Sequence, residues 1–175
     1  MCLVLWGDKQ SITTEVAGRA WGSDINMLRV SAKTHWIRSI GQHRLNARLE
    51  MGAIASSEFD DVPASLRFFT GGDQSIRGFS YQTISPLDED NDLIGAQYQL
   101  ASSLEYSYPI SDSWRAAAFV DIGTATNDFD ESLSKGIGVG TRWMSPVGPV
   151  RIYLARGIND QTRQWRLHFS MGPDL

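Results

Sequence analysis

Among the residues whose types and spacing suit chemistry, the acidic run Asp88, Asp90 and Asp92 is the most conspicuous. Alternate aspartates open calcium-binding loops, where their carboxylates coordinate the ion. Such a loop needs a glycine next and a glutamate at its end, whereas this sequence has Leu93 and Gln99 at those places. The run therefore predicts a solvated acidic loop and no metal site.

The histidines and the cysteine offer little more. His35, His43 and His168 are scattered along the chain without metal-ligand spacing. His168 could join a serine and an aspartate in a hydrolase site, but no local sequence pattern of a hydrolase supports that alternative. Cys2 is the single cysteine, so no disulfide can form within the chain. We therefore expect no enzyme activity, no metal and no cofactor.

Composition argues against two further classes of protein. The net charge of -4 at pH 7 argues against a nucleic-acid partner, because such a partner requires a basic face. No stretch approaches the roughly eighteen consecutive apolar residues of a transmembrane helix. The polar residues must therefore be positioned by elements other than transmembrane helices.

The dominant pattern is an alternation of apolar and polar residues with a period of two. Val120 and Ile122, for example, flank Asp121, and Leu104 and Tyr106 flank Glu105. Such alternation gives a β-strand one apolar and one polar face. Eight strands are predicted, the first on a weaker pattern than the others, over residues 11–21, 27–37, 43–55, 97–108, 114–125, 137–143, 150–154 and 165–171.

The lengths of these segments and their aromatic residues favour a membrane. About ten residues is the length with which a tilted strand crosses hydrocarbon. Membrane β-barrels place a girdle of aromatic residues at the level of the lipid headgroups. Aromatic residues near the ends of the predicted segments resemble this girdle, namely Trp21, Trp36, Tyr106, Tyr108, Trp114, Trp143 and Trp165. A soluble antiparallel barrel or sandwich shares the alternation, and it remains the alternative at this point.

One connection is far longer than a compact domain normally contains. It spans about residues 57–94 and includes the sequence GGDQSIRGF, from Gly71 to Phe79. Three shorter motifs follow it, Ser103-Leu104-Glu105-Tyr106, Phe119-Val120-Asp121-Ile122-Gly123 and Ser145-Pro146-Val147-Gly148-Pro149. Together, in this order, these motifs resemble those of the BamA/TamA superfamily of outer-membrane insertases, and the closing residues 171–175 resemble the TamA branch.

The resemblance implies a bacterial outer-membrane β-barrel whose long loop folds back into the lumen. The loop motif comprises Gly71, Gly72, Ile76, Arg77, Gly78 and Phe79. Strand parity places Glu105 and Asp121 on the lumen face, since their neighbours face lipid. Two carboxylates on adjacent strands need a cation, and we expect Arg77 to supply it.

The resemblance also implies an incomplete barrel and a function. The family barrel has sixteen strands, so the whole chain, 1–175, is expected to be the C-terminal half, without the periplasmic POTRA domains that contact a TamB-like inner-membrane partner. The last strand, with Trp165, Leu167, Phe169 and Met171, is expected to form one lip of a lateral seam. Through it, outer-membrane proteins or autotransporters would be assembled into the surrounding lipid by strand addition. A two-partner secretion channel, a passive pore and an outer-membrane hydrolase are the alternatives.

Overall fold

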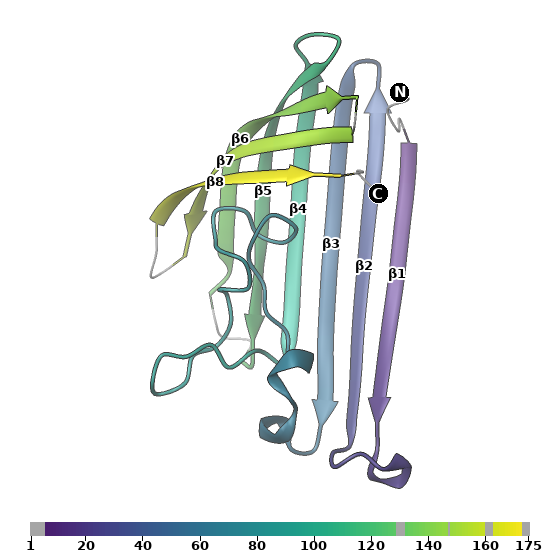
Figure 1. Ribbon diagram of the computed structural model, residues 1–175, viewed down its shortest axis with the longest axis vertical. Coiled ribbons are helices and arrows are strands. Elements are labelled where there is room, and N and C mark those ends of the chain that lie inside the picture. The colour runs from purple at the N-terminus through teal and green to yellow at the C-terminus, as the bar shows by residue number, and fades with distance from the viewer. Residues whose placement is uncertain (1–5, 129–131, 147, 160–162, 173–175) are drawn as a thin grey trace.

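The described part of the chain forms one curved antiparallel sheet of eight strands in sequence order, β1 to β8 (Figure 1). The computed structural model describes residues 6–128, 132–146, 148–159 and 163–172. The closing residues 173–175, whose sequence resembles the TamA branch, lie outside the described part. The strands are β1 Trp6–Ala17, β2 Met27–Ile40, β3 His43–Ser56, β4 Tyr98–Pro109, β5 Trp114–Thr126, β6 Ser134–Ser145, β7 Gly148–Ile158 and β8 Arg163–Met171.

The strand connections differ in length between the two ends of the sheet. Short connections at one end span residues 41–42, 110–113 and 146–147, and those at the other end span 18–26, 57–97, 127–133 and 159–162. The β3–β4 connection is the long loop, and it contains the short 3-10 helices η2 Phe59–Asp61 and η3 Ala64–Leu66. Because β3 and β4 pair directly, the loop leaves the sheet and returns to it at the same end.

The first strand is displaced from its predicted place. β1 ends at Ala17, and the residues beyond it form the 3-10 helix η1 Arg19–Trp21, where the sequence analysis predicts strand. Pairing with β2, from Trp6 opposite Arg38 to Ala17 opposite Met27, sets the true bounds. The alternation is weak here because β1 is an edge strand with polar residues on both faces. The stronger patterns of the other strands place them in the right segments, although β6 and β7 extend at both ends beyond the predicted 137–143 and 150–154.

The convex face of the sheet is apolar and suited to lipid. Leu104 and Val120 are 45% and 38% exposed on this face, while Glu105 and Asp121, next to them in sequence, are buried on the other. The Trp114 and Trp143 rings stack at 5.8 Å between centroids near the short turns. Lipid-facing strands with aromatic residues at their ends are typical of outer-membrane barrels. Within the described ranges, no helix has the length and apolarity needed to cross a membrane.

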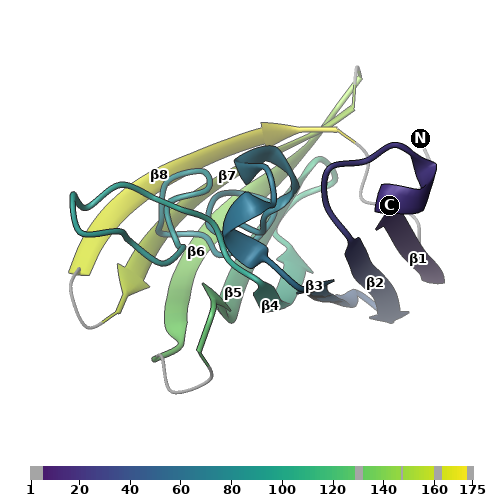
Figure 2. The same ribbon diagram turned by 90° about the horizontal axis from the view of Figure 1, so that it is seen from below.

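The long loop lies on the concave face of the sheet (Figures 1 and 2). Its base is held by an apolar cluster in which Val62 and Phe68 of the loop pack with Met27 and Ile54 of β2 and β3. Gly52 of β3 makes room for the Phe68 ring, because a Cβ atom there would overlap that ring. The base of the loop is thus packed against the sheet, here called the wall, and the motif from Gly71 to Phe79 follows along the chain.

The outward face provides a test of the membrane assignment. Replacing Val120 with arginine is expected to destabilise the protein in lipid by about 2–4 kcal/mol, the usual cost of a cationic side chain near the bilayer midplane. Gln99→Arg is the matched control, because Gln99 lines a cavity on the concave face. The free energy of unfolding of both variants is measured in lipid vesicles. Equal destabilisation would contradict the lipid-facing assignment.

Candidate functional site: an arginine of the loop bound to the barrel wall

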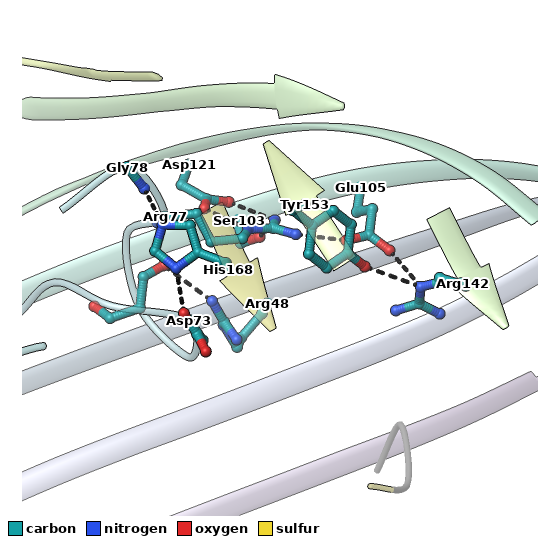
Figure 3. Close-up of polar contacts among 11 residues, drawn as sticks. Arg48, Asp73, Arg77, Gly78, Ser103, Glu105, Asp121, Arg142, Tyr153 and His168 are labelled. Atoms are coloured by element: carbon teal, nitrogen blue, oxygen red, sulfur yellow. Dashed lines mark hydrogen bonds and ion pairs between the residues drawn. The ribbon is translucent and has the colours of Figure 1, made fainter. Parts of the chain in front are cut away.

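The loop motif and the wall meet at Arg77, which is buried against β4 and β5 (Figure 3). Its Nε and Nη2 donate to the two carboxylate oxygens of Asp121, each at 2.8 Å. Its Nη1 donates to Glu105 at 2.6 Å, and its backbone N–H donates to Asp121 at 2.9 Å. The contact that the sequence predicts between Arg77 and the two lumen carboxylates is present.

The register of β4 and β5 brings the partners of Arg77 together. In the β4–β5 pair, Ser103 lies directly opposite Asp121, and Glu105 lies opposite Phe119. The hydroxyl oxygen of Ser103 accepts a bond from Arg77 Nη2 at 3.0 Å. The guanidinium carbon lies 3.4 Å from the centroid of the Phe119 ring. The flat fork of arginine therefore fits a bidentate carboxylate, a hydroxyl and an aromatic face at once.

The charge of the site is balanced by a second arginine. Glu105 also accepts from Arg142 of β6, whose Nε lies 2.8 Å from its carboxylate. Burial would lower the pKa of the Arg77 guanidinium, but hydrogen bonds and charges from Asp121 and Glu105 raise that pKa above the ordinary value. Arg77 is thus cationic at any physiological pH. The site can bind and hold a loop.

Glycines let the backbone of the loop reach the wall. Gly78 has a φ of 98°, and a Cβ atom there would collide with the backbone of Arg156 and Gly157 on β7. A Cβ atom on Gly136 of β6 would in turn collide with the carbonyl of Arg77. Gly136 of β6 and Gly157 of β7 are thus points at which the backbone of the loop touches the sheet.

The remaining residues of the motif shape the tip of the loop. The N–H of Gly72 donates to the carbonyl of Ile76 at 3.1 Å, which closes a tight turn. Ile76 is fully buried and packs with Phe79 and with Ala101 of β4. Gly71 and Gly72 both have positive φ angles, 107° and 103°. The six residues of the predicted motif thus act as one folded tip.

The predicted seam strand, β8, lies at the edge of the sheet. It pairs with β7, and within the described chain no other strand pairs with it. Trp165, Leu167, Phe169 and Met171 are exposed on the convex face, between 59% and 69%. His168, between them in sequence, is buried on the concave face and contacts the loop tip. Sequence parity predicts its direction, but nothing in the sequence predicts this contact with the loop.

Other residues of the site are also missed by sequence reasoning, namely Asp73, Ser103, Phe119, Arg142 and Tyr153. The Tyr153 hydroxyl accepts from Arg142 Nε at 3.1 Å. Parity places Ser103, Phe119 and Tyr153 on the lumen face, but it does not predict that they belong to the site of the loop arginine. Among the described residues, no group of His, Cys, Asp and Glu side chains could hold a metal ion.

A curved, antiparallel wall with a lipid-suited outer face and a long loop bound to its inner face defines an outer-membrane β-barrel. The chain belongs to the Omp85 superfamily, whose domain matches residues 6–174. It is a protein of the bacterial outer membrane. The BamA/TamA relationship predicted from the four motifs is therefore confirmed at the level of the superfamily.

Two curated relatives carry the name outer membrane protein assembly factor BamA. The protein from Nitratidesulfovibrio vulgaris is 34% identical over 142 residues, 74% of this chain and 18% of the relative. The protein from Neorickettsia risticii is 26% identical over 152 residues, 78% of this chain and 20% of the relative. This chain thus spans about a fifth of the length of the curated relatives it matches.

A solved structure shares the fold. The crystal structure of BamA from Haemophilus ducreyi lacking POTRA domains 1–3 matches 94% of this chain with a TM-score of 0.77. The sequence identity is 22%, and the match covers 37% of that chain. The eight strands therefore have the arrangement of part of an Omp85 barrel.

The buried ion pair leads to a prediction about stability. Arg77→Ala should cost about 3–5 kcal/mol of unfolding free energy, because it leaves the carboxylate of Asp121 buried without its cation. Loop residues 73–81 should also become sensitive to protease. The surface pair Arg19–Glu58, with side chains 62% and 54% exposed, is the control. Arg19→Ala should cost about 0–1 kcal/mol. Equal losses in the two variants would contradict the role of Arg77 in anchoring the loop.

Proposed function

We propose that the chain is part of the barrel of an outer-membrane assembly factor that inserts client β-barrel proteins through a lateral seam. The observation that carries this proposal is the edge strand β8, with apolar residues outside and a loop tip bound inside. An edge strand offers backbone N–H and C=O groups to an incoming strand, which is how β-augmentation works. The names of both curated relatives support the same function.

We further propose that the chain is the C-terminal half of a sixteen-stranded barrel and that its function is TamA-like. The support for the TamA branch is the resemblance of the closing residues 171–175. On this hypothesis, the clients are autotransporters or other outer-membrane proteins. A TamB-like inner-membrane protein would be engaged through POTRA domains encoded upstream.

The loop and its site have a specific part in this function. In the proposed mechanism, Arg77 holds the loop tip in the lumen, and Gly71, Gly72, Ile76, Gly78 and Phe79 shape the tip that is held. Glu105 and Asp121 are the wall partners. The anchored loop keeps the inner side of the seam ordered while Trp165, Leu167, Phe169 and Met171 present the outer side to lipid and client.

Depletion of the protein in its own bacterium tests the function. Loss of autotransporters alone from the outer membrane supports the TamA-like proposal, and loss of many outer-membrane proteins supports a BamA-like role. Arg77→Ala should reproduce the loss in part, and Arg19→Ala should not. Unchanged outer-membrane proteins after depletion would overturn the assembly function and favour a pore.

The seam can be tested directly by cross-linking. A photo-reactive residue at Leu167 should capture client strands during assembly, because β8 is an edge. The control is Leu104, which faces outward in the same way but lies on β4, between two paired strands. Capture at both positions, or at neither while the client is being assembled, would contradict insertion at the β8 edge.

A further inference from the structure

A second polar contact joins the loop tip to the wall, and it lies on the seam strand itself. The N–H of Gly78 donates to Nε2 of His168 at 2.8 Å. Nδ1 of the same ring forms a hydrogen bond with Oδ1 of Asp73. The imidazole is buried, and Figure 3 shows it between Asp73 and Gly78. Both loop partners lie within the tip, Asp73 inside its tight turn and Gly78 just after it.

The two contacts together define the protonation of the ring. A backbone N–H can only donate, so Nε2 must be the unprotonated nitrogen. The proton therefore lies on Nδ1, where the Asp73 carboxylate accepts it. The hydrogen bond at one ring nitrogen sets the state of the other. His168 thus accepts a hydrogen bond from one group of the loop and donates one to another. In the opposite tautomer, a protonated Nε2 would face the N–H of Gly78, and two donors would oppose each other.

The place of His168 in the sheet gives this contact its significance. Arg77 ties the loop tip to β4 and β5, in the middle of the described wall. His168 ties the same tip to β8, three strands further on. Gly78 touches the backbone of Gly157 on the intervening β7. The loop tip therefore bridges the wall from β4 to its edge.

We propose that His168 is a positioning residue that couples the loop tip to the seam strand. Movement of the tip away from the wall breaks the contact with β8, and displacement of β8 at the seam releases Asp73 and Gly78. Such coupling is reciprocal, because each contact stabilises the arrangement that the other requires. The consequence for client insertion rests on the proposed function, whereas the coupling itself is a property of the fold.

The first test measures the tautomer of the wild-type ring. Nitrogen NMR of ¹⁵N-histidine in the full-length protein in lipid nanodiscs separates the two neutral tautomers. His168 should be the Nδ1-protonated form, and His168→Gln assigns its signals among those of the chain's three histidines. An Nε2-protonated or rapidly exchanging ring would overturn the proposal, whatever the result of the depletion experiment.

The second test measures the coupling by hydrogen exchange. His168→Ala should speed exchange of the Gly78 amide by about tenfold, the effect of losing one buried hydrogen bond. Asp73→Ala, a change in the loop, should speed exchange of amides in β8. Ser170→Ala, on the same strand and face as His168, is the control and should change neither.

Two further substitutions of His168 distinguish a hydrogen-bonding role of the side chain from a packing role. His168→Gln supplies an acceptor for the Gly78 N–H and should restore its protection, while His168→Leu fills the space and should not. Equal protection of Gly78 in His168→Leu and the wild type would overturn the proposal. If His168→Ala does not fold, the wild-type tautomer and the Asp73→Ala exchange decide the question without it.

Discussion

The fold depends on the burial of one cation, the guanidinium of Arg77, against the inner wall. An arginine removed from water is very costly unless its donors are satisfied, and here Asp121, Glu105 and Ser103 satisfy them. Asp121 in turn requires the loop, since without Arg77 its buried carboxylate would be the uncompensated charge. The wall and the loop are therefore stable together and poorly stable apart.

This interaction constrains residues that have no charge. The backbone N–H of Arg77 also donates to Asp121, so the backbone of the loop lies directly on the sheet, and that close approach leaves no room for side chains at the contact. Gly136 on β6 and Gly78 in the loop meet this requirement, as does Gly157 on β7. The apolar base around Phe68 brings the loop to the wall, and the glycines let its tip settle there.

Much of the fold is predictable from the sequence because a strand's period fixes its faces. Parity placed Glu105 and Asp121 inside correctly, but their cation came from the family resemblance, since no local pattern links Arg77 to strands many residues later. The contact of Asp73 with His168 was not predictable, because it depends on how far the sheet curves between β4 and β8. The first strand was misplaced because polar residues on both faces of β1 leave no clear alternation.

In the proposed function β8 is a seam strand, and its pairing explains why it should be held from the inner face of the sheet. Unpaired backbone groups at the edge of β8 are costly in hydrocarbon, so the edge favours any strand that pairs with it. When such a seam opens, β8 must lose its pairing with the strand at its free edge while it stays attached to the rest of the sheet. The outer face of β8 cannot provide this attachment, since its apolar residues are exposed and offer no polar contact to the loop. A polar contact on the inner face can, because it is independent of pairing at the edge. His168 makes that contact, and it makes it with the loop that Arg77 holds in place.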